Sequence, residues 1–304
     1  MKSHRAFKNA SHHNKYKDMT SATNFDQDRI KLVIGVVAPG KAIGQHKQFL
    51  RSVNLAVENI NKAEADVRLY VIDSGIDLSH LESKVEVLRF DSAASTDLCG
   101  AMNKLMSAAF SDQTTDCFLC VNPDGILHYK ALSELLLSNS AHAQSLIEAR
   151  EFPEEHSKQY DPKTHETSWA SRSCLLIPRK IFEVIGEFDP NLSTYLADVD
   201  FSWRARSAGF SVRVASNALF GHTEMRQTLS PHDEKRLLLS GRYLAFKWKN
   251  ERFVEWAEKT LIERGFFQSL TELPALPQLN SNATAINPIV ADFNHGLFFS
   301  QCRW

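Results

Sequence analysis

Three acidic residues stand where segments of regular structure begin or end, and their carboxylates could bind a cation or take up a proton. Asp73 closes the apolar run VRLYVI, Asp124 follows the run CFLCV within the sequence NPD, and Asp198 opens a helical pattern in ADVDFSWRARSA. Carboxylate oxygens are preferred ligands of Mg²⁺, and a carboxylate can act as a general base towards a hydroxyl group. Each acid alone could instead cap a helix, but capping does not account for all three together.

The segments that must position these acids alternate between strand and helix from about residue 30 to residue 140. We expect strands at 30–37, 67–72, 85–89 and 117–121, and helices at 48–61, 98–110 and 129–139. This alternation predicts a parallel sheet with helices on both faces, in which ligands bind outside the carboxyl ends of the strands. Asp73 and Asp124 should therefore share one crevice. The sequence has neither a GxGxxG motif after the first strand nor a GxxxxGK[ST] motif, which disfavours the ordinary dinucleotide-binding and P-loop folds.

The second half of the chain begins with a long polar connection at 149–168, which we expect to be functional or disordered. A strand at 171–177, helices at 179–185 and 198–208, and a strand at 211–215 follow. After Pro231, apolar and aromatic residues recur with helical spacing. These last helices should pack on the main domain, with docking on a membrane or a partner as the alternative.

Composition excludes several classes of protein. A formal net charge of −1 over 304 residues gives no general argument for nucleic-acid binding. No run approaches the ~18 apolar residues that a membrane span needs, and the polar segment 1–28 is expected to be a disordered tail. The five cysteines fit a reducing cytoplasm, and Cys117 and Cys120 are interpreted as small buried strand residues rather than a redox or zinc motif.

Three blocks of the sequence resemble a known family. They are FLCVNPDGILHYKALSELL, EAREFPEEHSKQYDPKTHETSWASRSCLLIPRKIFEVIGEFD and YLADVDFSWRARSAGFSVRVASNALFGH. In order and spacing they resemble family-2 glycosyltransferases with the GT-A fold, in particular the rhamnosyltransferase-like branch. The resemblance implies an α/β fold with a mostly parallel central sheet flanked by helices and a C-terminal helical extension. The expected division is a polar tail at 1–28, a catalytic domain at 29–228 and an extension with a tail at 229–304.

The resemblance also implies a metal site and a nucleotide site. Asn122-Pro123-Asp124 matches the family's N-x-D form, so Asp124 is expected to bind Mg²⁺ or Mn²⁺. His222 matches a late histidine near that metal, with an ordinary structural histidine as the alternative. The residues expected at the nucleotide are Pro39, Asp73, Asn103 and Asn122. Gly40-Lys41 replace the polar residue and asparagine of the family, which leaves the nucleotide preference open.

On the acceptor side, the resemblance makes Asp198 the general base of an inverting transfer. Ala197 stands where the family has glutamate, and Asp200 is expected to be structural. Trp169 is expected to stack on sugar, with a core aromatic as the alternative. Arg172 replaces a family glycine, so its side chain could pair with phosphate or obstruct the site.

The implied activity is metal-assisted transfer of a sugar, rhamnose in this branch, from a nucleotide-diphosphate donor to a hydroxyl group of a glycan or glycolipid. The implied setting is surface-polysaccharide synthesis in the cytoplasm, with peripheral association at the inner face of the membrane. The main alternative is a catalytically degenerate member of the same fold that binds nucleotide or glycan within a synthesis complex; Ala197 and Arg172 favour it. A nucleotidyltransferase is a weaker alternative, because the first loop is not rich in glycine and basic residues.

Overall fold

The computed structural model describes residues 29–38, 43–60, 64–73, 85–90, 97–192, 194–222, 229–279 and 287–303, without the side chains of residues 43–46 and 73. The expected tail at 1–28, the nucleotide contact expected from Pro39 and the boundary expected at residue 228 lie outside the described residues. For Asp73 the structure gives the backbone alone.

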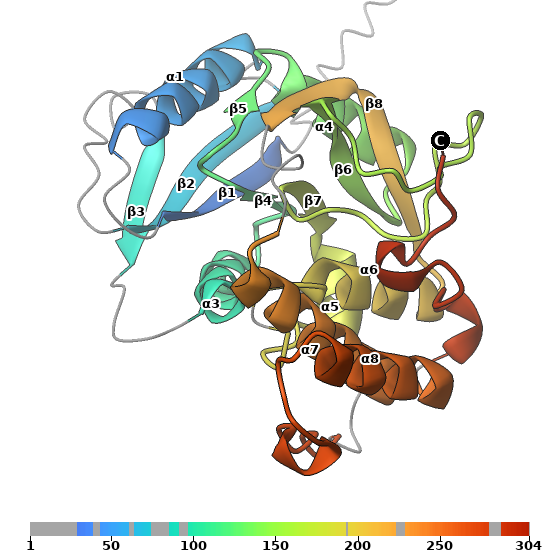
Figure 1. Cartoon of the computed structure of the whole chain (residues 1–304). Helices are drawn as coiled ribbons and strands as arrows, with labels where there is room; N and C mark the ends of the chain where they lie inside the picture. The colour runs from blue at the N-terminus through green and yellow to red at the C-terminus, as the bar shows by residue number, and fades with distance from the viewer. Residues whose placement is uncertain are drawn as a thin grey trace, which may run out of the picture.

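The core of the fold is one curled sheet (Figure 1). Its strands are β1 (Ile30–Ala38), β2 (Ala65–Asp73), β3 (Glu86–Phe90), β4 (Cys117–Val121), β5 (Ile126–Leu127), β6 (Ser145–Pro153), β7 (Cys174–Pro178) and β8 (Ser211–His222). They lie in the order β3-β2-β1-β4-β7-β6-β8-β5. The first four strands are parallel, and β6 is parallel to β8, whereas β7 and β5 run antiparallel to their neighbours.

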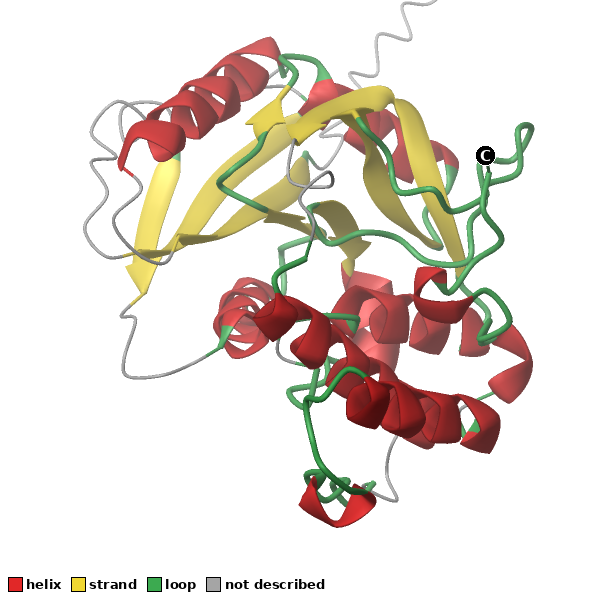
Figure 2. Cartoon of the chain, in the orientation of Figure 1, coloured by secondary structure: helices red, strands yellow, loops and turns green. Residues whose placement is uncertain are grey.

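Helices cover both faces of the sheet, as the colouring by secondary structure in Figure 2 makes clear. The helices are α1 (Ile43–Asn59), α3 (Leu98–Ser111), α4 (Ala131–Ala141), α5 (Arg179–Ile185), α6 (Ala197–Ser207), α7 (Pro231–Lys247) and α8 (Glu251–Glu263). Helices α1 and α4 pack on one face, and α3, α5 and α6 pack on the other, with α7 and α8 beyond them. Among the described helices, none is long and apolar enough to cross a membrane.

The strand sequences explain this layering. In β1, Leu32, Ile34 and Val36 belong to the apolar cluster on one face of the sheet, and Val33 and Val37 belong to the cluster on the other. A strand buried on both faces needs a continuous apolar run rather than alternating polar residues. The expected α/β architecture with a mostly parallel sheet is therefore confirmed.

The segment expected as a long connection contains a strand that the sequence pattern did not predict. Its first residues complete β6, because Glu148, Arg150 and Glu151 interrupt the apolar run although they lie within the strand. The remainder, up to residue 168, is an ordered loop with a bridge between Tyr160 and Thr167. The two neighbouring strand predictions also change at one end: the strand expected at 171–177 begins at Cys174, and β8 continues beyond residue 215 to His222.

The C-terminal segment 287–303 returns to the sheet domain and lies along this loop. The backbone N–H of Gln159 donates to the carbonyl of Gln301 (2.8 Å), and the N–H of Arg303 donates to the carbonyl of Ser157 (2.7 Å). Trp169 Nε1 donates to the carbonyl of Phe298 (3.0 Å). Residues from the end of the chain thus reach the carboxyl end of β6.

Candidate functional site

The turn after β4 presents Asp124 at the edge of the sheet. The backbone N–H of Asn122 donates to the carbonyl of Ser173 (2.9 Å), which ties the end of β4 to the segment before β7. The turn closes with a hydrogen bond from the Gly125 N–H to the Asn122 carbonyl (3.4 Å). The Asp124 side chain is 28% exposed, although its Oδ1 oxygen is buried.

His222 reaches the same place from the last residue of β8. Strand β5 pairs with β8, Ile126 opposite Gly221, and so brings the turn alongside the end of β8. Asp124 Oδ1 lies 3.4 Å from His222 Nε2. The two residues expected as metal ligands are therefore neighbours in space although they are far apart in sequence.

Gly125 allows this approach. A Cβ atom at Gly125 would lie 2.0 Å from the ring of Phe220, so only glycine leaves room for that ring under the turn. The Phe220 ring in turn stacks on the imidazole of His222, with centroids 5.7 Å apart and an interplanar angle of 24°. The glycine next to Asp124 thus helps to fix the histidine opposite it.

The pair of Asp124 and His222 fits a divalent cation. One carboxylate oxygen and one imidazole nitrogen separated by 3.4 Å can both reach a single ion at the usual ligand distance of about 2.0–2.2 Å. Within the described residues no group of three or more His, Cys, Asp and Glu side chains could hold a metal. Further ligands would be phosphate oxygens and water, as is usual for Mg²⁺. The metal assignment stays a prediction.

Asp198 lies in the first turn of α6 and is half-buried. Two residues before Asp198, Leu196 has a left-handed backbone conformation (φ 66°). This conformation is uncommon for a side chain of this size, and such strain is often found at functional sites. Two backbone donors hold the carboxylate: the N–H of Arg172 on Oδ2 (3.3 Å) and the N–H of Val199 on Oδ1 (3.0 Å).

One short segment connects Asp198 with the turn that carries Asp124. Arg172 donates its N–H to the Asp198 carboxylate, and the next residue, Ser173, accepts the N–H of Asn122. The expected base and the expected metal ligand therefore lie on either side of the same two residues. Asp73 ends β2 opposite Ala38, and Val36 pairs with Val121 of β4, so the backbone of Asp73 lies at the same edge of the sheet.

A cavity of about 410 Å³ opens beside Asp198. It is lined by Glu154, Glu155, His156, Ser157, Lys158, Trp169, Thr194, Tyr195, Leu196, Asp198, Val199, Leu237, Leu297, Phe298 and Phe299. Its size is at the lower end of the range for small-molecule sites, about 300–1,000 Å³. The cavity combines a carboxylate with apolar and aromatic side chains, which suits a sugar with hydroxyl groups and an apolar ring face.

Trp169 lines this cavity but does not offer a free stacking face. Its side chain is buried (7% exposed), the Lys158 ammonium lies 4.1 Å from the ring centroid, and the His156 ring meets it edge-on at 5.0 Å. The burial of the ring and the Lys158 ammonium over it favour the alternative of a core aromatic, and stacking of Trp169 on a sugar stays a prediction. The indole instead holds the loop and the C-terminal segment together.

Arg172 points away from the cavity. Its guanidinium donates to Cys99 Sγ (3.2 Å) and to the carbonyl of Thr194 (2.9 Å), and its side chain is absent from the cavity lining. These contacts join the start of α3 to the loop before α6. A direct contact between Arg172 and a phosphate stays a prediction.

Asn103 is buried rather than exposed on its helix. Its Nδ2 donates to the carbonyl of Phe188 (2.8 Å), and its Oδ1 accepts the N–H of the same residue (3.0 Å). Both polar ends of the amide are thus engaged in fixing the chain beyond α5. Contacts of Asn103 and Asn122 with a nucleotide stay predictions.

The structure adds a group of ionisable residues that the sequence pattern did not predict; Glu148, Glu151 and Lys158 are buried, and His156 is partly exposed. Lys158 Nζ binds Glu148 Oε2 at 2.5 Å and the carbonyl of Trp169 at 2.8 Å. Burial raises the pKa of Glu148 to about 7, although Lys158 opposes this. Glu151 Oε2 lies 3.6 Å from His156 Nε2, and desolvation, assisted by Lys158 and His222, lowers the pKa of His156 to about 3. His156 is therefore neutral at neutral pH. Spacing gave no signal for this group, since its members come from a strand and an irregular loop.

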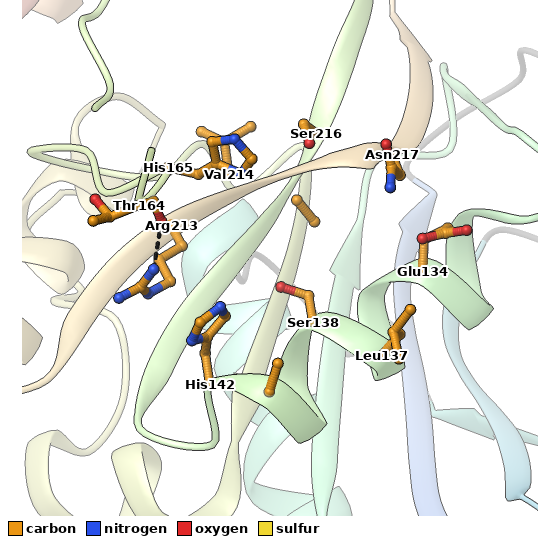
Figure 3. A pocket seen from close by; sticks show the side chains of 12 residues that line it. Glu134, Leu137, Ser138, His142, Thr164, His165, Arg213, Val214, Ser216 and Asn217 are labelled. Carbon is orange, nitrogen blue, oxygen red and sulfur yellow. Dashed lines mark hydrogen bonds between the residues drawn. The ribbon is translucent and has the colours of Figure 1, made fainter. Parts of the chain in front are cut away.

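Figure 3 shows a second hollow, of about 210 Å³, between α4 and the first half of β8. It is lined by Glu134, Leu137, Ser138, Ala141, His142, Thr164, His165, Arg213, Val214, Ala215, Ser216 and Asn217. Arg213 closes one side, because it donates to the carbonyl of Thr164 and pairs with Glu166 (2.5 Å). This hollow contains none of the expected site residues and shares no lining residue with the cavity beside Asp198.

Comparison with known proteins identifies the fold. No protein-family model matches the chain, and no curated protein matches it either. Among solved structures, the crystal structure of GalNAc-T7 with UDP, GalNAc and Mn²⁺ is similar over 82% of this chain, with a TM-score of 0.54 and 12% identity. The chain spans about half of the length of that protein (54%). The structure of S. aureus TarS residues 1–349 is similar over 79% of this chain and 73% of its own, with a TM-score of 0.49 and 12% identity. At such identity the likeness to GalNAc-T7 is informative about architecture alone. The chain therefore has the GT-A glycosyltransferase fold.

Proposed function

We propose that this protein is an inverting, metal-assisted glycosyltransferase that moves a sugar from a nucleotide-diphosphate donor to a hydroxyl group of a glycan or glycolipid. The observation that supports the proposal most strongly is the pair of hydrogen bonds through Arg172 and Ser173, because the Asp198 carboxylate and the turn that carries Asp124 lie on either side of these two residues. The cavity that Asp198 lines provides space for an acceptor.

Different residues of the chain would act on the donor side and on the acceptor side of this site. Asp124 and His222 would hold Mg²⁺ or Mn²⁺, which when bound neutralises the charge of the departing nucleoside diphosphate. Asp198 takes the proton from the acceptor hydroxyl as that oxygen forms the new bond to the anomeric carbon. A single displacement of this kind needs one base on the acceptor side, and backbone donors already orient this carboxylate.

The donor, the cation, the transferred sugar and the biological setting are each supported by a single kind of evidence. The UDP and Mn²⁺ in the GalNAc-T7 crystal favour a nucleotide donor and a divalent cation here. Membership of family 2, rhamnose as the transferred sugar, and a place in surface-polysaccharide synthesis at the membrane rest on the sequence resemblance.

Replacing Asp198 tests the role of the base. In Asp198→Asn we expect turnover to fall on the order of 10²–10⁴, the usual contribution of a general base, with little change in donor affinity. Sugar nucleotides that raise the melting temperature with Mn²⁺ would be selected first, because a true donor stabilises by mass action. Release of nucleoside diphosphate would then be compared between wild type, Asp198→Asn and the control Asp66→Asn, whose residue is exposed at the start of β2.

The second candidate, a binding protein without turnover, predicts equal and negligible release in all three proteins together with intact nucleotide binding. Ala197 and Arg172 are the sequence features that favour it. In the structure Ala197 is buried in the apolar core, and Asp198 is held by backbone donors instead of a neighbouring acid. The missing glutamate therefore does not leave the base without support, which favours the enzyme.

A further inference from the structure

The cavity beside Asp198 has an apolar wall that comes from the end of the chain. Leu297, Phe298 and Phe299 line it from the C-terminal segment, which is hydrogen-bonded to the loop that contributes Glu154 to Lys158. Phe299 is fully buried, whereas Phe298 is 56% exposed. An aromatic side chain that lines a cavity and keeps half of its surface free can stack on a ligand.

The position of Phe298 is fixed by its backbone. Its carbonyl accepts the indole N–H of Trp169 at 3.0 Å, and the pairing of Gln301 and Arg303 with the 157–159 loop holds the following residues. The ring is therefore carried on an anchored segment. Trp169, whose ring is covered by Lys158, acts as the anchor for this segment.

The charges around the cavity disfavour anionic ligands. Glu154, Glu155 and Asp198 bring carboxylates to the lining, and the Glu155 carboxylate is paired with Arg150 (2.6 Å) and Arg303 (3.0 Å). Lys158 is the one lysine or arginine among the lining residues, it is 3% exposed, and its ammonium is engaged by Glu148 and Trp169. Arg236 is not among the lining residues, but it donates to the Thr194 hydroxyl and lies 5.8 Å from the centroid of the Tyr195 ring. An anionic ligand would lie beside the Glu154 and Asp198 carboxylates, while Lys158, Arg150 and Arg303 are already paired with glutamates.

Neutral polar groups are available to the hydroxyl groups of a ligand. Ser157 and His156, both from the loop, line the cavity, and Asp198 would accept a hydrogen bond from the reacting hydroxyl. His156 Nε2 lies 3.6 Å from Glu151 Oε2, and the imidazole meets the Trp169 ring edge-on. The lining thus combines groups that can bind hydroxyls with an aromatic ring, and these match the two kinds of surface that a pyranose presents.

We infer that this cavity binds an uncharged sugar residue as the acceptor, with Phe298 as its stacking surface, and that it selects against acceptors that carry phosphate or carboxylate. This inference rests on the proposed function and names its acceptor class. It also assigns a role in acceptor recognition to the C-terminal segment, far in sequence from the acids of the site.

Saturation-transfer NMR with simple glycosides tests the inference without a donor. The probes are the methyl glycosides of glucose, galactose, mannose, rhamnose and N-acetylglucosamine, with methyl glucuronoside and glycerol phosphate as anionic counterparts. Wild type should bind at least one neutral glycoside and bind the anions more weakly. Phe298→Ala should weaken neutral binding about two- to tenfold, the equivalent of one aromatic contact, and Phe298→Trp should retain it.

Ile289→Ala is the matched control, since Ile289 belongs to the same C-terminal segment, is 91% exposed and does not line the cavity. Its binding should equal that of wild type. Unchanged binding in Phe298→Ala, tighter binding of the anions, or no binding of any neutral glycoside would each overturn the inference. Nucleoside-diphosphate release, measured separately, reports on the proposed function: neutral glycosides that bind to a protein without donor turnover would contradict the transferase and leave this acceptor site standing.

Discussion

Two aspartates in the same helix show how the environment sets the role of a residue. Asp198 is half-buried at the cavity, and backbone donors leave part of its carboxylate free for a substrate. Asp200 is fully buried and is engaged by Arg204 (2.8 Å), Lys247 (2.9 Å) and Trp248 Nε1 (3.0 Å). The expectation that Asp200 is structural is confirmed, and its contacts join α6 to α7. Sequence could separate these two acids only through the family resemblance, because both precede the same apolar pattern.

The cysteines give a prediction at the scale of single residues. Burial raises the pKa of Cys99 to about 11 and the pKa of Cys117 and Cys120 to about 12, and the pKa of Cys174 is also raised by burial. Since the thiolate is the reactive form, these four buried thiols should be inert at pH 8. In the native protein Ellman's reagent should label Cys302 alone, the one exposed thiol, and should label all five cysteines after unfolding.

Cys302→Ser provides the control for thiol labelling and should remove the rapid native reaction. Rapid labelling of more than one thiol in the native wild type would contradict the burial of the β4 cysteines. It would also reopen the redox interpretation of Cys117 and Cys120.

At the scale of elements, the strands with continuous apolar runs could be predicted from the sequence, whereas a strand that combines apolar and charged residues could not. The apolar runs of β1, β2 and β4 gave their positions, and the observed strand β4 has the predicted bounds Cys117–Val121. Strand β6 was not predicted, because Glu148 and Glu151 interrupt its apolar pattern. These two residues are buried through contacts with partners such as Lys158 and His156, and periodicity cannot reveal such contacts. The partner in a buried ion pair is brought close only by folding. A local sequence pattern therefore predicts that the charged residues of such a pair are exposed.

Gly125→Ala tests how the turn after β4 is built. The new methyl group would meet the Phe220 ring, and we expect a loss of about 1–3 kcal/mol in the free energy of unfolding, as is usual for overpacking. Displacement of Phe220 should also move His222 and weaken Mn²⁺ binding. Urea unfolding measures the first effect and calorimetric titration with Mn²⁺ measures the second.

Gly221→Ala is the matched control for this turn, because a Cβ atom there would find its nearest neighbour at an ordinary 3.5 Å. It should unfold within a few tenths of a kcal/mol of wild type, as surface-like substitutions do. Equal stability of the two variants would mean that Phe220 can move aside without cost and that Gly125 does not fix the site.

For the molecule as a whole, the sheet topology explains why distant residues meet. Asp73 and His222 end β2 and β8, Asp124 lies in the turn after β4, and the order of those strands brings these residues to one edge. This much of the site followed from the α/β pattern and the resemblance. The role of segment 287–303 did not, because its pairing with the 157–168 loop depends on contacts between residues more than a hundred positions apart, such as Gln159 with Gln301.

The same long-range contacts explain why Trp169 is buried. An aromatic residue beside a catalytic motif suggested a stacking surface, whereas the structure uses its indole N–H to hold Phe298 and leaves the Phe298 ring exposed. The sequence predicted an aromatic side chain on the acceptor side and assigned this role to Trp169. In the structure Trp169 anchors the segment that carries Phe298. Phe298, which we infer to be the stacking surface, comes from a segment with no recognisable motif.

We propose that Asp124 and His222 bind a cation, which in turn holds a nucleoside diphosphate beside Asp198. This claim can be tested by calorimetric titration of UDP and of thymidine diphosphate into the whole protein, with Mn²⁺ and with EDTA. Wild type and Asp66→Asn should bind a nucleoside diphosphate more tightly with Mn²⁺, and Asp124→Asn should lose that gain while it keeps its melting temperature without ligand. A gain from Mn²⁺ that is as large in Asp124→Asn as in wild type would contradict the claim.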